Sequence, residues 1–402
     1  MSNLSDTLHT CPACGLLCDD ISSAAAASQQ LACGQAARFY ARQAASVSAQ
    51  IDGQPTSLTQ AVEAAARLLG QASAPLVAGS STDVHGARAL VSLAQHTGAA
   101  MTHLNASSTL RNMQVLQHRG WQTTTLTEVR NRADVILMIG TDVVSHNPRF
   151  FERVVWVEEA MFTEASARQI IYLGGDVLDT QAGIAPDGRL PHLIPCASGD
   201  LPAVMAVLRA LVLGKPVAGT AVAGIAIATL QALAETLKAA RYATLVWVAK
   251  DLDFAHAELT IENITETVVA LNQKSRAMGL SLGGSDGDTS VNYAHTWLNG
   301  VIIDAPDWPS HDAIVWVNSY SPEAMPPAGT APVIVLGAPD STFDVTPAVF
   351  IPVATPGLDC GGQQFRVDGS VTLPLTAIRP SDLPTLSQVT AMIQAQLTGA
   401  SA

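Results

Sequence analysis

Four of the six cysteines lie within the first 33 residues, and their spacing is that of a metal-binding loop. Cys11, Cys14 and Cys18 form a C-x2-C-x3-C run, and Cys33 follows after a short spacer. Thiolates converge on one metal only where the backbone can curl around it, and Gly15 frees the turn after the second cysteine. In a chain without an evident secretory signal, such a group indicates a metal site sooner than a set of disulfides.

The uneven spacing bears on the kind of metal. Zinc ribbons usually carry two CxxC pairs, whereas a CxxCxxxC run with one distant cysteine suits a [4Fe–4S] cluster better. We therefore predict that Cys11, Cys14, Cys18 and Cys33 are metal ligands, for a [4Fe–4S] cluster or for zinc. The alternative stays open that they are small buried hydrophobic residues at a site without metal.

The composition of the whole chain limits its partners. Only 14% of its 402 residues are charged and 48% are hydrophobic, which indicates a surface partly covered by other chains. The net charge of −13 argues against binding to nucleic acid or to an anionic membrane. No apolar run reaches the roughly 18–20 residues that span a bilayer, and no secretory signal is evident. We expect a cytoplasmic protein of two or three domains.

Buried strands alternate with amphipathic helices along most of the chain, which predicts an α/β fold with parallel sheets. The expected strands cover residues 75–79, 133–140, 168–174, 244–249, 312–318, 332–337 and 349–353. The expected helices cover residues 36–49, 58–69, 84–96, 201–213, 216–240 and 259–272.

Two polar segments invite a functional interpretation that the residues do not support. The glycine-rich stretch 281–288 could cradle a phosphate, but it lacks lysine and its two aspartates would repel an anion. His146 follows a strand, where α/β folds bind ligands, yet a lone histidine there is more often structural. Walker A, G-x-S-x-G and H-E-x-x-H motifs are absent from the sequence.

Several segments resemble one protein family in the same order over most of the chain. Residues 11–21 resemble the N-terminal cluster segment of the B subunit of formylmethanofuran dehydrogenases, which belong with the molybdopterin oxidoreductases. Residues 131–140 and 145–149 are similar to the family's "NRADVV…G…SHPR" pattern. Residues 269–298 resemble its helix-loop segment, and 352–369 its "PGIDAEGTAYRMDG" pattern.

The resemblance implies the fold of the formate dehydrogenase and molybdopterin oxidoreductase group, with several parallel-sheet α/β domains and a small N-terminal cysteine-rich domain. On that basis we expect the cysteine-rich domain at residues 1–54. A discontinuous α/β domain would follow at 55–129 and 241–402, with a second α/β domain inserted at 130–240. Strands 75–79 and 244–249 should then share one sheet.

A departure from the family pattern bears on activity. In the active dehydrogenases a cysteine or selenocysteine followed by histidine ligates tungsten or molybdenum. The corresponding stretch here, residues 105–112, contains neither cysteine nor histidine. Ser107 or Ser108 could offer an oxygen donor, but a hydroxyl matches a soft thiolate site poorly. We therefore do not expect a tungsten or molybdenum pterin.

This pattern resembles the B subunit of the bacterial formyltransferase/hydrolase complex. In that family an amidohydrolase-like A subunit hydrolyses and a D subunit transfers the formyl group, between a tetrahydromethanopterin carrier and a methanofuran-like carrier. The resemblance implies a non-catalytic structural subunit with A, C and D subunits as partners. Two alternatives remain: a working oxidoreductase with a tungsto- or molybdopterin and a [4Fe–4S] cluster, or an independent electron-transfer or metal-sensing module.

Overall fold

The chain folds into two compact units, each a mixed α/β arrangement with parallel strands. The computed structural model describes residues 7–28, 31, 33–43, 47–176, 178–305, 307–329 and 331–400. The first unit comprises Met1–Ser107, Gly284–Arg366 and Val371–Ala402, and the second comprises Ser108–Gly283 and Val367–Ser370. In the described ranges, no helix combines the length and apolar character needed to cross a bilayer.

The first unit is built on a seven-stranded sheet in the order β4-β3-β16-β15-β14-β5-β6. The five strands from β16 to β6 are parallel, and the hairpin of β3 and β4 adds antiparallel to β16. The strands are β3 (Ala49–Ile51), β4 (Gln54–Thr56), β5 (Pro75–Ser81), β6 (Ala100–Met101), β14 (Ala313–Asn318), β15 (Val333–Gly337) and β16 (Val349–Pro352).

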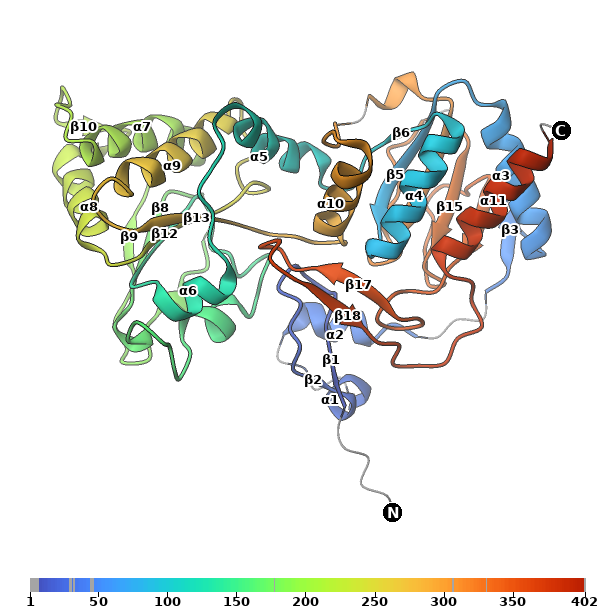
Figure 1. The fold of residues 1–402 in the computed structure, drawn as a ribbon, viewed down its shortest axis with the longest axis horizontal. Coiled ribbons are helices and arrows are strands. Elements are labelled where there is room, and N and C mark those ends of the chain that lie inside the picture. Colours follow the sequence, from blue (N-terminus) through green and yellow to red (C-terminus); the bar gives the residue numbers. More distant parts are fainter. Residues whose placement is uncertain are drawn as a thin grey trace, which may run out of the picture. The chain divides into compact units, whose positions relative to one another are not determined.

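Helices α3, α4 and α11 pack beside one another over one face of this sheet (Figure 1). Alternate strand residues such as Val77 and Val315 reach that face, because successive side chains of a strand point to opposite sides. The helices of this unit are α3 (Leu58–Gln71), α4 (Val84–Thr97), α10 (Asp288–Asn299) and α11 (Leu386–Ala400). Capping fixes where two of them begin: Ser57 and Gln60 form a capping box at α3, and the Asp83 side chain accepts the N–H of Gly86 at α4.

The second unit contains a fully parallel five-stranded sheet in the order β13-β12-β7-β8-β9. Its strands are β7 (Val135–Ile139), β8 (Gln169–Leu173), β9 (His192–Ile194), β12 (Ala243–Val248) and β13 (Ala277–Leu282). Its helices are α6 (Leu126–Arg132), α7 (Leu201–Val212), α8 (Ile227–Ala239) and α9 (Glu258–Leu271), while α5 (Ala106–Arg119) spans the chain crossing between the two units.

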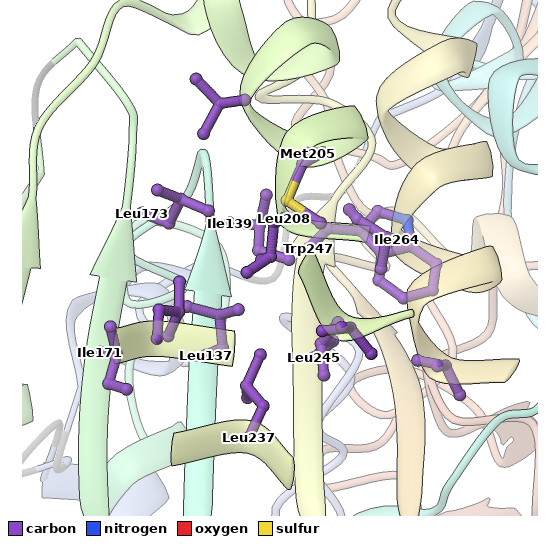
Figure 2. Packing of buried hydrophobic residues seen from close by; sticks show 14 of the residues in the cluster. Leu137, Ile139, Ile171, Leu173, Met205, Leu208, Leu237, Leu245, Trp247 and Ile264 are labelled. Carbon is purple, nitrogen blue, oxygen red and sulfur yellow. The ribbon is translucent and has the colours of Figure 1, made fainter. Parts of the chain in front are cut away.

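One continuous apolar core holds the second unit together. Leu137 of β7 and Leu245 of β12 lie on the same face of the sheet as Met205 of α7 and Ile264 of α9 (Figure 2). Strands β7 and β12 are buried along their whole length, as expected of parallel strands that are covered on both faces.

The remaining elements are short. They are β1 (Leu8–His9), β2 (Ile21–Ser22), α1 (Ser23–Ser28), α2 (Gly34–Tyr40), β10 (Ala221–Val222), β11 (Ile225–Ala226), β17 (Gly362–Phe365) and β18 (Thr372–Leu375). A π-helix covers Phe151–Val155, and single 3-10 turns cover Ala165–Ala167, Gln181–Gly183, Ser198–Asp200 and Trp308–Ser310.

All seven predicted strands are present, but the prediction that strands 75–79 and 244–249 share a sheet is wrong. β5 belongs to the seven-stranded sheet, whereas β12 pairs with β7 and β13 in the five-stranded one. An apolar run shows that a strand is buried, but it does not show which sheet the strand joins. The compact second unit accordingly covers residues 108–283, where the sequence suggested an insertion at 130–240.

Two predicted helices are shorter than expected. The helix expected at 36–49 begins at Gly34 and ends at Tyr40, and residues 44–46 of that range lie outside the described part of the chain. Within 216–240 only α8 is helical, because Ala223 and Gly224 adopt positive φ and turn the chain into the β10–β11 hairpin. The expected limit at residue 54 also falls inside the β3–β4 hairpin of the main sheet.

Candidate functional site

Three of the four N-terminal cysteines lie on one closed loop between β1 and β2. The backbone N–H of Cys11 donates to the carbonyl oxygen of Cys18 at 2.8 Å, and that of Leu17 donates to the carbonyl of Cys14 at 3.3 Å. Leu17 has a φ of 49°, a left-handed conformation that turns the chain directly before Cys18. The backbone thus folds the C-x2-C-x3-C run back on itself.

Cys33 joins this loop from the start of α2. Its thiol is the N-cap of the helix and accepts the backbone N–H of Ala36 at 3.4 Å. Tyr40, at the other end of α2, donates its hydroxyl to the carbonyl of Thr10 at 3.4 Å. The hydrogen bond of Tyr40 thus attaches the C-terminal end of α2 to the cysteine loop.

The four thiols affect one another electrostatically. Burial raises the pKa of the Cys11 thiol far above its ordinary value, and negative charge on Cys14, Cys18 or Cys33 raises that pKa further. Burial likewise raises the pKa of Tyr40, whose hydroxyl is paired with Cys11. A bound cation would offset the cost of buried thiolates, so metal binding here would release protons.

In donor type these residues fit a soft metal ion or an iron–sulfur cluster. None of the six cysteines, all of which the structure describes, forms a disulfide. Within the residues that the structure describes, no three His, Cys, Asp or Glu side chains are arranged as a metal-binding group. The assignment of Cys11, Cys14, Cys18 and Cys33 as metal ligands therefore stays a prediction.

Charged residues fasten the cysteine segment (the described residues 7–28, 31 and 33–43) to the rest of the first unit. The Arg42 guanidinium makes a two-pronged ion pair with Asp340, at 2.9 and 2.7 Å, and donates to the carbonyl oxygen of Ser319 at 2.9 Å. The Arg42 side chain is 9% exposed, so the pair is largely shielded from water.

A second pair of charged residues continues this attachment. Arg379 donates to Asp359 at 2.7 Å and to the backbone carbonyl of Arg42. The Asp359 carboxylate is 3% exposed and also accepts the N–H of Thr355 at 3.0 Å. On the other side of the segment, the His9 ring hydrogen-bonds to Thr376 at 2.6 Å.

The stretch where the family resemblance places a tungsten or molybdenum ligand starts with a buried amide. Asn105 donates its side-chain amide to the Asp288 carboxylate at 2.8 Å and to the Ser285 hydroxyl at 3.0 Å. Residues 106–112 form the first half of α5. Ser107 is exposed and Ser108 is half-buried, so neither is a deeply enclosed oxygen donor.

The partner of Asn105 is a strongly perturbed acid. Burial raises the pKa of Asp288 to about 6, although the hydrogen bond from Asn105 acts in the opposite direction. His103 lies fully buried nearby, with one ring nitrogen 3.1 Å from the Asn292 amide, and burial lowers its pKa to about 4. At neutral pH this group therefore contains an ionised Asp288 and an uncharged His103.

The polar segments that the sequence analysis interpreted as structural have partners within the protein. His146 lies 2.6 Å from Asp251, and Asp286 of the glycine-rich stretch accepts the hydroxyl of Ser321. Gly287 has a φ of 74°, and a Cβ there would lie 1.9 Å from the carbonyl oxygen of Thr82. Close packing accounts for this glycine without a bound phosphate.

The residues that hold these sites in place come from distant parts of the sequence and were not predicted from it. Arg42 and Asp340 are 298 residues apart, and Asn105 and Asp288 are 183 apart. A single sequence carries no signal that pairs residues over such distances.

Comparison with known proteins relates most of the chain to two kinds of B subunit. No model of a protein family matches the chain. It is 24% identical over 397 residues to the B subunit of a tungsten-containing formylmethanofuran dehydrogenase 2 of Methanococcus maripaludis, covering 89% of this chain and 91% of that protein. It is 25% identical over 375 residues to the B subunit of the formyltransferase/hydrolase complex Fhc of Methylorubrum extorquens, covering 86% and 95%. The chain is a homologue of these B subunits.

The three-dimensional comparison agrees with the homology to the B subunits. The structure matches a chain in the crystal structure of the formyltransferase/hydrolase complex (FhcABCD) from Methylorubrum extorquens in complex with methylofuran. The TM-score is 0.73 at 25% identity, over 88% of this chain and 99% of the other. The B-subunit resemblance predicted from the cysteine and glycine segments is thus confirmed.

Proposed function

We propose that this chain is the B-type structural subunit of a formyltransferase/hydrolase complex and performs no catalysis itself. The observation that carries the proposal is Asn105. It opens the stretch where an active dehydrogenase of the family would place its metal ligand, and its amide is bound to Asp288 and Ser285. An amide held by a carboxylate and a hydroxyl is not a thiolate donor for a soft metal.

The proposed fold is that of the molybdopterin oxidoreductases, with the ligand to the pterin metal replaced. Two sheets built mainly of parallel strands, with helices packed against them, support this assignment. The loops at the carboxyl ends of the strands, where parallel α/β sheets usually bind ligands, would here serve the architecture of the subunit. The His146–Asp251 and Asp286–Ser321 pairs, which tie such loops together, support this role.

In the proposed complex the partners are an amidohydrolase-like A subunit, a C subunit and a formyltransferase D subunit. The complex would move a formyl group from a tetrahydromethanopterin carrier to a methanofuran-like carrier and release formate. We place it in the cytoplasm, because its six cysteines, all within the described ranges, form no disulfide, as is usual in a reducing compartment.

Purification of the tagged chain from its native cells tests the proposal. We expect the A, C and D chains to co-purify in fixed ratio, together with formyltransferase and hydrolase activities. Tungsten and molybdenum, measured per chain by mass spectrometry, should be far below stoichiometric. One tungsten or molybdenum per chain, or recovery of the chain alone as a monomer, would refute the proposal.

The four cysteines carry a second proposal, that a [4Fe–4S] cluster or zinc held by Cys11, Cys14, Cys18 and Cys33 cross-links the N-terminal segment. When bound, the metal would supply structural attachment in a segment too small to build much core. Its test is the content of iron, sulfide and zinc per chain after anaerobic preparation, with Cys14→Ser alongside. If all three are absent and Cys14→Ser assembles normally, the cysteines act through packing alone.

A further inference from the structure

The amino-terminal edge of the five-stranded sheet carries a cavity that no part of the proposed function uses. It has a volume of about 540 Å³, within the range of roughly 300–1,000 Å³ usual for small-molecule sites. Its lining consists of Thr123, Thr124, Thr125, Glu128, Arg132, Phe162, Arg241, Tyr242, Arg276 and Met278. All of these belong to the second unit.

The sheet itself sets the positions of the three arginines. Arg241 lies two residues before β12, Arg276 directly precedes β13, and Arg132 is the last residue of α6, three before β7. These three strands are neighbours and run in parallel, so their starts lie along the same edge. The opposite edge is where parallel α/β sheets usually bind ligands, so this cavity is separate from that position.

The arginines differ in how their charge is balanced. Arg132 forms an ion pair with Glu128 at 2.7 Å and stacks on Phe162, with its guanidinium carbon 4.0 Å from the ring centroid. Among the residues that the structure describes, the side chains of Arg241 and Arg276 have neither an ion pair nor a hydrogen bond. Both residues are exposed, so the cavity presents two solvent-facing positive charges without a carboxylate partner among the described residues, in a chain whose net charge is −13.

The nearby carboxylates of Asp134 and Glu128 bind other groups. Asp134 accepts the backbone N–H groups of Arg241 and Tyr242 at 2.8 and 2.9 Å, which fixes the start of β12. Glu128 is held by Arg132. In the described part of the chain, neither carboxylate is hydrogen-bonded to the guanidinium of Arg241 or Arg276.

The cavity also has a rigid polar wall. Thr124 and Tyr242 share a hydrogen bond of 2.7 Å between their hydroxyls, and both residues are buried. The segment that contains Thr124 is clamped to β13, because the N–H of Thr124 donates to the carbonyl oxygen of Gly279 at 2.9 Å and the N–H of Gly279 donates to that of Gln122 at 2.9 Å. Glycine fits the crowded position 279, since a Cβ there would lie 3.0 Å from the Trp247 ring and 3.4 Å from the carbonyl oxygen of Gln122.

We propose that Arg132, Arg241 and Arg276 form a binding site for a small oxyanion that carries phosphoryl or carboxylate groups. A guanidinium presents a planar fork of N–H donors that matches the oxygen pairs of both groups. Arg241 and Arg276 supply charge and donors, and the stacked Arg132 adds a third donor of fixed orientation. Thr125 adds a hydroxyl group: its oxygen accepts the N–H of Glu128 at 3.1 Å, which leaves its hydrogen to donate.

The test is calorimetric titration of the full chain, at low ionic strength, with two probes: pyrophosphate and citrate. We expect saturable binding at one site per chain. Arg241→Ala and Arg276→Ala should each weaken binding by about tenfold or more, because a charge-assisted hydrogen bond is lost. Tighter binding of pyrophosphate would assign the site to phosphoryl groups, and tighter binding of citrate would assign it to carboxylates.

Arg38→Ala is the matched control, since it removes one exposed positive charge from α2, outside the cavity. It should leave both affinities unchanged. Thermal unfolding should be the same for all three variants, because the side chains of Arg241 and Arg276 have no partners to lose among the described residues. Absence of saturable binding, or equal weakening by Arg38→Ala, would overturn the proposal.

Discussion

The cysteine segment and the five-stranded unit are held in their folded state by opposite means. The segment is attached to the rest of the first unit through charged and polar side chains, chiefly Arg42 with Asp340 and Arg379 with Asp359. The five-stranded unit is held by one apolar core that runs through β7, β12, α7 and α9. A single substitution should therefore have different consequences in these two parts of the chain.

The largest effect is expected at the Arg379–Asp359 pair. Arg379→Ala leaves the Asp359 carboxylate, 3% exposed, without its cation. Loss of one partner of a buried pair costs roughly 3–5 kcal/mol. We expect the loss to be local, with faster amide hydrogen exchange in residues 7–43 and little change in β7 and β12. If amide hydrogen exchange accelerates equally in both regions, the two regions do not unfold independently.

A cavity in the apolar core should destabilise the other region. Leu137→Ala removes a side chain that is fully buried in β7 and should cost about 2–5 kcal/mol of unfolding free energy. Leu137→Met, which keeps the volume, should cost less than about 1.5 kcal/mol. Denaturant unfolding measures both. If the two variants lose the same stability, packing in this core is not what holds the unit.

Asp288, in the first unit, should make the stability of the fold depend on pH. Its folded-state pKa is about 6, above the ordinary value of 3.8, because burial favours the protonated form. The folded state therefore keeps a proton that the unfolded state has lost, and stability falls as pH rises from about 4 to above 6.

Asp288→Asn removes this titration. Relative to the wild type, the variant should gain stability, on the order of 2 kcal/mol, between about pH 4.5 and pH 7.5. Thermal unfolding of both proteins across this range gives the difference. A difference that is flat with pH, or that has the opposite sign, would contradict the raised pKa.

The smallest effect is expected where a charged pair is exposed. Arg119 pairs with Glu262 at 2.9 Å, with its side chain 56% exposed. Arg119→Ala should cost less than about 1 kcal/mol, because water and salt screen such a pair. Denaturant unfolding of Arg119→Ala and Arg379→Ala in one series compares an exposed ion pair with a buried one. The difference in lost stability gives the contribution of burial. If Arg119→Ala loses as much stability as Arg379→Ala, burial does not decide how much an ion pair contributes here.

The sequence predicts strands well where the apolar run is unbroken, as at residues 133–140 and 332–337, which contain β7 and β15. It misses β13, because Gly279 and Ser281 interrupt the run. It misses α5 as well, because polar residues dominate that helix. Which sheet β12 joins depends on its pairing with β7 and β13, and the periodicity of apolar residues does not encode that pairing.

Of the two candidate sites, one can be predicted from the sequence and the other cannot. The cysteine spacing is visible because Cys11, Cys14 and Cys18 are close in sequence. The arginine cavity is invisible, because Arg132, Arg241 and Arg276 come together only once the order of three strands is known. Each arginine does precede a buried strand, and that pattern becomes informative only together with the topology.

The discontinuity of the first unit has a consequence for synthesis of the chain. β5 pairs with β14, whose first residue emerges about 230 residues after β5 ends, which takes on the order of 10–50 s at ribosomal rates. The second unit, contiguous over residues 108–283 except for Val367–Ser370, is almost entirely synthesised well before then. β5 can meanwhile pair only with β6, so the edge of β5 that will meet β14 stays open while another sheet forms. During that interval a nascent chain would benefit from a chaperone, and a slower-translated stretch after residue 283 would prolong the exposure of β5.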